Sequence, residues 1–281
     1  MAQVVTPADP SAAEGGRSLD LRTELPYWRA TVYPDACEAT VTLVVPGNGS
    51  AESDLSDEER QRRNHIRATR RAITESRRFM VANRLRYMWV LTFSSSLQGA
   101  EGRRECMRLV AQFAERLRDE TGRLPYWYSP ELHPLGHGWH VNFFVGKRLP
   151  HGDVERLWGH GFVWVKDWVK DSRVQRGTSG TFVEALRLAS SYGCKYAAKD
   201  WSAEALDGGA HRYEISQGFK PRALSLRADS VGSALRFARS YFGGRYPDSV
   251  WRSSDSDSWD GPPVWCVSWS SAAGEEGDGD G

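Results

Sequence analysis

The alternation of apolar and polar positions predicts a short hairpin and a long helix in the first third of the chain. β-branched residues dominate positions 31–33 and 39–45, and the second run ends at a Pro-Gly-Asn-Gly sequence, which is typical of a strand followed by a turn. Residues 53–86 lack this alternation, begin with acidic side chains and carry arginines throughout. Because acidic residues stabilise the start of a helix, we expect this segment to be helical.

Strands and helices alternate regularly from residue 87 onward. Apolar segments of β-rich composition predict strands at 87–93, 126–131, 139–145 and 161–168. Apolar side chains at helical spacing predict helices at 101–120, 151–158 and 181–199. The order β-α-β-β-α-β-α indicates an α+β fold in which helices flank a central antiparallel sheet.

The same pattern suggests how the chain is divided. We expect an N-terminal extension, a basic helical segment, a compact core, a C-terminal region of mixed structure and an acidic tail, at residues 1–50, 51–86, 87–204, 205–270 and 271–281 respectively. Residues 1–20 and the tail are rich in small, polar, glycine or acidic residues. We expect both to be disordered, because they have little apolar surface to bury.

Composition is that of a soluble globular protein. Hydrophobic residues make up 40% of the chain and charged residues 26%. The sequence contains no apolar run of the roughly 18 residues that a membrane span needs, and its start lacks a basic stretch followed by an apolar one. We therefore expect a cytoplasmic protein with no membrane partner. The four cysteines are scattered and form no C-x-x-C pair, which argues against a disulfide framework and against structural zinc.

The net charge of +1 conceals an uneven distribution of charge. Ten arginines lie between Glu59 and Arg86, whereas acidic residues gather in the C-terminal tail. Dense arginines are typical of a surface that binds phosphates, and a solvated helix with many ion pairs has the same composition. If the segment binds phosphates, we expect the contacts from seven of these arginines: Arg62, Arg63, Arg67, Arg70, Arg71, Arg77 and Arg78.

Three side chains on the predicted strand pair have the chemistry of a metal site. His140 and Asn142 are two residues apart on a strand, so they share one face of the sheet. A hairpin brings Glu131 of the preceding strand alongside them. A carboxylate, an imidazole and an amide oxygen suit Mg²⁺ or Mn²⁺. A histidine and an asparagine on a strand are also common as hydrogen-bonded structure, so the residues alone leave both interpretations open.

Two tyrosines on the last predicted helix are candidates for nucleophiles. Tyr192 and Tyr196 are four residues apart, so both hydroxyls reach the same region. Lys195 and Lys199 each follow a tyrosine by three positions and place an ammonium group beside each phenol. A phenol, with a pKa of about 10, becomes nucleophilic when nearby cations or a metal stabilise the phenolate. The alternative is that both rings belong to the apolar stripe of the helix and pack on the sheet.

Part of the chain resembles the HUH endonuclease superfamily. Residues 91–93, Leu-Thr-Phe, are similar to the first motif of the family, a hydrophobic strand. Glu131, followed by His140-Val-Asn142, resembles the metal motif, in which a glutamate precedes a His-hydrophobic-His triplet. Asn142 stands in place of the second histidine, and this departure bears on the affinity for metal and on the choice of metal. Two loop histidines rank below Glu131 as alternative ligands: His133 and His137.

The resemblance continues on the predicted helix. Tyr192 and Tyr196, with the lysines that follow them, are similar to the catalytic helix of the two-tyrosine branch of rolling-circle replication initiators. The resemblance spans residues 87–200 and presents the motifs in the family's order. It implies that Tyr196 is the first nucleophile and Tyr192 its partner. It also implies that Lys195 and Lys199 neutralise charge on the phosphate and the phenolate.

The resemblance implies a metal-dependent endonuclease and strand transferase, with Mg²⁺ or Mn²⁺ as cofactor. Such an enzyme nicks single-stranded DNA at a plasmid or phage replication origin and remains attached through a 5′-phosphotyrosine. The sequence contains no Walker-type P-loop, so host helicase and polymerase machinery are implied partners. Trp158, Trp164 and Trp168 are open to two interpretations, stacking on unpaired bases or core packing. The alternative functions are a relaxase or transposase of the same superfamily and a non-catalytic DNA-binding regulator.

Overall fold

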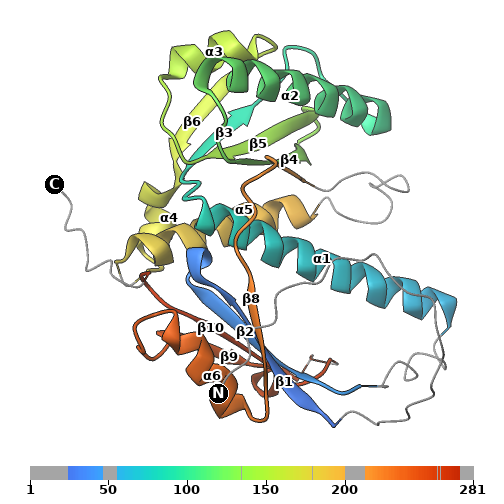
Figure 1. Cartoon of the computed structure of the whole chain (residues 1–281). Helices are drawn as coiled ribbons and strands as arrows, with labels where there is room; N and C mark the ends of the chain where they lie inside the picture. The colour runs from blue at the N-terminus through green and yellow to red at the C-terminus, as the bar shows by residue number, and fades with distance from the viewer. Residues whose placement is uncertain are drawn as a thin grey trace, which may run out of the picture.

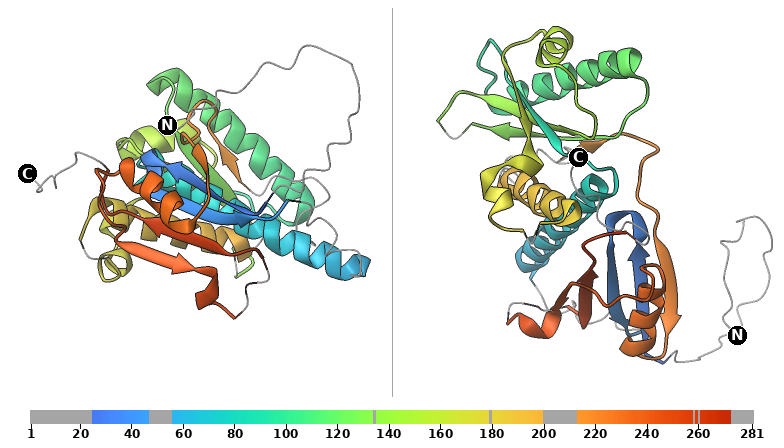
Figure 2. Two further views of the ribbon diagram at one scale, coloured as in Figure 1. Left: turned by 60° about the horizontal axis from the view of Figure 1, so that its bottom comes forward. Right: turned by 90° about the vertical axis from the view of Figure 1, so that its left-hand side faces the viewer.

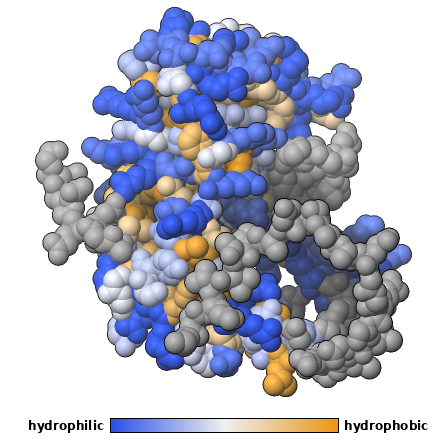
Figure 3. Space-filling model, in the orientation of Figure 1, coloured by the Kyte–Doolittle hydropathy of each residue, from blue (hydrophilic) through white to orange (hydrophobic). Residues whose placement is uncertain are grey.

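The protein is mixed α+β, with two antiparallel five-stranded sheets and six α-helices in its described part (Figure 1). The computed structural model describes residues 25–46, 56–133, 135–178, 180–199, 213–257, 259 and 261–272, with the backbone alone at residue 172 and residues 195–199. The α+β class expected from the sequence is confirmed. Much of the face shown in Figure 3 is hydrophilic, as expected when the large apolar side chains lie in internal cores.

The first sheet contains every strand that the sequence predicts between residues 87 and 168. We call it the β5 sheet, and its strand order is β6-β3-β5-β4-β7. Its strands are β3 (Tyr87–Leu91), β4 (Tyr126–Leu132), β5 (Trp139–Val145), β6 (Val163–Asp167) and the two-residue β7 (Glu214–Ile215). β5 lies in the middle and pairs with β3 on one side and β4 on the other. β7, which the sequence did not predict, extends the sheet beyond β4.

Helices cover both faces of the β5 sheet (Figures 1 and 2). The four long or medium helices are α1 (Asp57–Ala82), α2 (Gly99–Thr121), α3 (His151–Trp158) and α5 (Phe182–Lys199). α2 and α3 cover the face on which the Phe143 ring stacks against Trp89 and Tyr128, with centroids 5.6 and 5.5 Å away. α1 and α5 cover the opposite face, where Phe144 is buried. A short α4 (Ser172–Gln175) leads into α5.

Local contacts at its two ends make α1 shorter than the predicted segment 53–86. The Ser56 hydroxyl accepts a hydrogen bond from the backbone N–H of Glu59 at 3.2 Å, and the Glu59 carboxylate accepts one from the Ser56 N–H at 3.1 Å. This reciprocal capping fixes the start of the helix. Beyond Ala82 the backbone of Arg84 adopts a left-handed φ of 54°, which a continuing helix does not allow.

The second sheet combines the N-terminal hairpin with C-terminal residues that the sequence pattern left unassigned. We call it the β1 sheet, and its order is β8-β1-β2-β10-β9. Its strands are β1 (Tyr27–Tyr33), β2 (Glu38–Val44), β8 (Leu224–Ala228), β9 (Ser249–Arg252) and β10 (Val264–Ser268), with α6 (Val231–Ser240) packed on one face. The predicted hairpin is confirmed by the antiparallel pairing of β1 with β2. Residues of the expected N-terminal extension and C-terminal region thus share one sheet.

A buried carboxylate joins the β1 sheet to α1. Glu38, at the start of β2, is 5% exposed and forms ion pairs with Arg77, at 3.0 Å, and with Arg78. The Arg78 guanidinium also donates to the Thr40 hydroxyl at 2.8 Å and stacks on the Tyr33 ring at 3.9 Å. Two guanidinium groups and one carboxylate therefore hold the hairpin against the helix.

The predicted disorder of residues 1–20 and of most of the tail falls on residues that the structure does not describe. Within the part of the chain that it does describe, no helix combines the length and apolar character that crossing a bilayer requires.

The junction makes a first prediction. Replacing Glu38 by Gln leaves Arg77 and Arg78 side by side without their counter-charge, so we expect the free energy of unfolding to fall by about 2–3 kcal/mol. Urea denaturation measures this change. The control is Glu105→Gln, which removes an exposed ion pair with Arg108 on α2 and should cost less than about 0.5 kcal/mol. Equal losses in the two variants would contradict a structural role for Glu38.

Candidate functional site

Strand register brings the three predicted metal ligands together. β4 and β5 pair so that Glu131 lies directly opposite His140, and Asn142 follows two residues later on the same face. The Asn142 amide Nδ2 donates to Glu131 Oε2 at 2.6 Å, and His140 Nε2 lies 3.4 Å from the same oxygen. Glu131 Oε2 is therefore close to both the His140 imidazole and the Asn142 amide.

The site is largely shielded from solvent. Asn142 is 8% exposed, and the side chains of His140 and Glu131 are 14% and 19% exposed. His140 Nδ1 is buried and has no hydrogen-bond partner among the residues that the structure describes. Leaving a buried imidazole nitrogen without a hydrogen-bond partner costs free energy. His140 Nδ1 is therefore a polar atom that the described residues leave unsatisfied.

The donor set fits a hard divalent cation if the Asn142 amide presents its oxygen. The two orientations of an amide have the same shape, and the assignment of nitrogen and oxygen follows from the hydrogen-bond network. In the orientation described, Nδ2 satisfies Glu131; a half-turn of the amide brings Oδ1 to the same point. Among the described residues, no three His, Cys, Asp or Glu side chains form a group that could hold a metal. The metal site expected from the sequence therefore requires the Asn142 amide as its third ligand.

A cavity of about 450 Å³ opens next to His140. Its wall includes the two loop histidines that the sequence offered as alternative ligands. The His133 ring lies 4.7 Å from the His137 ring and 5.9 Å from the His140 ring, centroid to centroid. His133 Nδ1 accepts a hydrogen bond from the backbone N–H of Leu135 at 3.2 Å. The loop histidines thus line the approach to the site, while Glu131 contacts both of the other predicted ligands.

Two exposed aromatic rings line the same cavity. Phe162 is 63% exposed and Trp164 is 43% exposed, and alternation along the chain places both on the face that carries Asn142. Lys166, the next residue in this alternation, holds its ammonium group 5.3 Å from the Trp164 ring centroid. The same ammonium group pairs with the buried Asp171 carboxylate, so the two exposed rings are what is suited to stacking on an unpaired base. The sequence analysis missed Phe162, which the two-residue spacing from Trp164 would have revealed.

The other two tryptophans belong to the cores. Trp158 is fully buried and donates from its indole N–H to the Thr92 carbonyl at 2.7 Å. Trp168 is 6% exposed and donates to the Ala189 carbonyl at 2.9 Å. Core packing is therefore the correct interpretation for these two rings, and base stacking stays an expectation for Trp164 alone.

Helix α5 packs on the sheet face that carries the candidate ligands. Phe144 lies two residues beyond Asn142 and so points to the same face, where Gly193 of α5 covers its ring. A Cβ atom at Gly193 would lie 2.8 Å from the Phe144 ring, so glycine permits this close approach. Tyr192 is half-buried and packs against the apolar cluster that contains Phe144. The side chains of the other three predicted catalytic residues lie outside the described part of the chain: Lys195, Tyr196 and Lys199.

The predicted DNA-binding arginines fall into two groups. Arg77 and Arg78 are engaged by Glu38 at the junction, which gives them a structural role. The other five are exposed on the part of α1 that precedes Ala72, its first buried residue: Arg62, Arg63, Arg67, Arg70 and Arg71. The expectation of phosphate contacts therefore applies to these five.

No protein-family model, curated protein or solved structure matches this chain. Its candidate site therefore has to be judged on its own geometry.

The donor set makes a prediction that does not depend on catalysis. Glu131→Gln removes the charged ligand while keeping its shape, so we expect the affinity for Mn²⁺, measured by calorimetry, to fall by at least about tenfold. Asn142→His should keep Mn²⁺ binding, because imidazole is a good ligand for this ion. The matched control is Glu155→Gln at an exposed position of α3. Equal Mn²⁺ affinity in Glu131→Gln and the control would rule out a metal site at Glu131.

Proposed function

We propose that this protein is a metal-dependent endonuclease and strand transferase that acts on single-stranded DNA, as a rolling-circle replication initiator of the HUH type. The observation that carries the proposal is the meeting of Glu131, His140 and Asn142 on the sheet face that α5 covers. Glu131 on β4 and the pair His140 and Asn142 on β5 belong to one face of one sheet, and α5 covers that face. A divalent metal held by these three side chains supplies a positive charge beside the scissile phosphate.

The tyrosines of α5 supply the nucleophiles in this proposal. The phenol oxygen of Tyr196 bonds to phosphorus, the P–O3′ bond breaks and the 3′ oxygen takes up a proton. The products are a 5′-phosphotyrosine and a free 3′-hydroxyl that primes synthesis. Tyr192 provides the second phenol for strand transfer. Lys195 and Lys199, one helical turn from each phenol along the chain, are positioned in sequence to neutralise the charge that builds on the phosphate.

Two surfaces support a single-stranded substrate. The cavity beside His140 presents Phe162 and Trp164, whose exposed rings are suited to stacking on unpaired bases. The exposed arginines of α1 form a positively charged surface that suits the DNA backbone. A non-catalytic regulator, the alternative from a different class, requires the charged surface but neither tyrosine.

Substituting the tyrosines tests the proposal directly. We expect Tyr196→Phe to lose most of the covalent adduct with single-stranded origin DNA, seen on a denaturing gel with Mn²⁺, while still binding that DNA. Tyr192→Phe should nick yet fail at strand transfer, the step that needs a second phenol. Phenylalanine keeps the ring, so the packing of Tyr192 against the apolar cluster survives.

The control for these variants is Tyr246→Phe, which changes a phenol that is 76% exposed and belongs to the β1 sheet side of the chain. It should form the adduct as the unaltered protein does. Persistence of the adduct in the double variant Tyr192→Phe/Tyr196→Phe would exclude both tyrosines as nucleophiles and refute the proposal. Loss of the adduct from Tyr192→Phe alone would reverse the order of attack.

The exposed arginines of α1 make a separate prediction. Replacing Arg62, Arg63, Arg70 and Arg71 by Gln should flatten the dependence of single-strand affinity on salt, by roughly 0.7 units of logarithmic slope for each phosphate that the protein no longer neutralises. Fluorescence anisotropy at several salt concentrations measures the slope. The matched control replaces four exposed arginines on or next to α2 and α3: Arg104, Arg108, Arg148 and Arg156. An equal change of slope in both sets would indicate a general charge effect instead of a binding surface on α1.

A further inference from the structure

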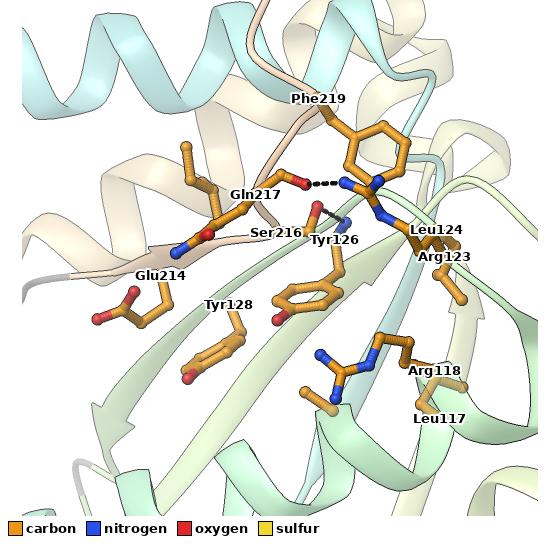
Figure 4. A pocket seen from close by; sticks show the side chains of 12 residues that line it. Leu117, Arg118, Arg123, Leu124, Tyr126, Tyr128, Glu214, Ser216, Gln217 and Phe219 are labelled. Carbon is orange, nitrogen blue, oxygen red and sulfur yellow. Dashed lines mark hydrogen bonds between the residues drawn. The ribbon is translucent and has the colours of Figure 1, made fainter.

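A second cavity lies on the opposite face of the β5 sheet from the candidate metal site. It has a volume of about 410 Å³, within the roughly 300–1,000 Å³ of pockets that hold small molecules. Tyr126 and Tyr128 of β4 face this cavity, whereas Glu131, an odd number of residues further along the strand, points to the α5 face. Its wall comes from the end of α2, from β4 and from β7 with the residues after it (Figure 4).

We propose that this cavity binds a nucleoside monophosphate, either as a free nucleotide or as one residue of a single strand. The proposal rests on the lining of the cavity, which has arginines at one end, a carboxylate at the other and two phenols between them. It is independent of the proposed cleavage reaction, because no residue of this cavity belongs to the metal site or to α5.

The phenols supply hydrogen-bonding groups to the cavity. Tyr128 is 5% exposed, and its ring is fixed by stacking on Phe143. Within the described ranges, no hydrogen bond to another side chain contributes to the pKa of either phenol, which is set by burial and by nearby charges. Burial raises the pKa of both phenols, so both stay protonated and can donate at neutral pH. The Tyr128 ring is nearly buried while the residue lines the cavity, so its hydroxyl is available to a ligand or to water there.

The cationic end of the cavity is built from two arginines. Arg123 Nη2 donates to the Gln217 carbonyl at 3.2 Å, and its guanidinium lies 5.7 Å from the Phe219 ring centroid. Gly218 has a φ of 86° there, and a Cβ atom on it would collide with Arg123 Nη2, so the glycine allows this placement. Arg118, in the last turn of α2, is exposed and forms no ion pair among the described residues. A guanidinium with free donors is suited to a phosphate.

The opposite end carries a carboxylate. Figure 4 shows Glu214 and Arg118 on opposite sides of the two tyrosine rings, with the Gln217 side chain near Glu214. A carboxylate accepts hydrogen bonds from the exocyclic amino group of a base, as it does from cytosine N4. With two arginines and one carboxylate, the residues that line the cavity carry a net positive charge, which favours an anionic ligand. A ligand with a phosphate at one end, an amino-bearing base at the other and sugar hydroxyls between them matches all three features.

The test is calorimetric titration of the full-length protein in EDTA, which removes the metal that the proposed cleavage requires. The ligands are the four deoxynucleoside monophosphates, deoxycytidine, inorganic phosphate and a short mixed-sequence single strand. We expect dCMP, dAMP and dGMP to bind at least about tenfold more tightly than deoxycytidine or phosphate. Deoxycytidine lacks the phosphate group, and inorganic phosphate lacks the base and the sugar. The affinity for dTMP should be the lowest of the four, because thymine has no amino group for Glu214.

Substitutions assign the binding to this cavity. Arg118→Gln should weaken dCMP binding by about tenfold and leave deoxycytidine unchanged, since it removes the guanidinium that binds the phosphate. Tyr128→Phe keeps the stacked ring and should weaken dCMP binding because the hydroxyl is removed. Glu214→Gln should raise the affinity for dTMP relative to dCMP, because an amide can donate to a thymine carbonyl. The matched control is Arg104→Gln, an exposed arginine of the same helix outside the cavity.

The outcomes separate the two sources of the ligand. Binding of free monophosphates that depends on Arg118 supports a free nucleotide. Binding of the oligonucleotide alone, with the same dependence, supports one residue of a strand. Phosphate that binds as tightly as dCMP, an affinity unchanged in Arg118→Gln, or no binding by any of these ligands would overturn the proposal. None of these results depends on adduct formation by Tyr192 or Tyr196, so the two proposals can fail separately.

Discussion

The alternation of side chains along β5 is the constraint on which both cores and the candidate site depend. Consecutive residues of a strand point to opposite faces, so Phe143 and Phe144 anchor two different apolar clusters from adjacent positions. His140 and Asn142 share the face of Phe144. A shift of pairing by one residue would exchange the two faces, burying the imidazole and the amide beneath α2 and turning Phe143 toward α5. The packing that stabilises the sheet therefore also determines where the candidate metal ligands lie.

The neighbouring strand repeats this constraint with different chemistry. On β4, Tyr126 and Tyr128 point to α2, whereas Trp127 and Glu131 point to the α1 and α5 face. The Trp127 indole donates to the buried hydroxyl of Ser76 at 2.9 Å, which fixes β4 against α1. The phenols of the second cavity and the Glu131 carboxylate of the candidate metal site are thus positioned by the same strand and the same buried hydrogen bond.

The sequence predicted those parts of the fold that local pattern determines. The strands and helices between residues 87 and 199 follow from the periodicity of apolar residues. Glu131 lies opposite His140 because β4 and β5 are consecutive strands that pair as a hairpin. The β1 sheet could not be predicted, because β1 pairs with β8, with 194 positions between Thr31 and its partner Ser225. The local pattern of neither strand indicates which strand it pairs with. The second cavity was missed for a similar reason, since β7 joins β4 only through long-range pairing.

The positions of charged residues in the sequence were the least reliable basis for prediction. A high density of arginines does not distinguish a binding surface from a structural junction. Arg77 and Arg78 belong to the same arginine-rich run as Arg62 and Arg63, yet Glu38 engages the first pair and leaves the second exposed. The difference arises where α1 meets the β1–β2 hairpin: only the buried half of the helix reaches the carboxylate. If Arg77 or Arg78 left Glu38 to bind a phosphate, the buried carboxylate would lose part of its counter-charge. An uncompensated buried charge is strongly destabilising, so these two guanidinium groups stay with Glu38. The exposed arginines of α1 do not compensate Glu38, so the proposed contacts with DNA phosphates would not require a buried carboxylate to lose its counter-charge.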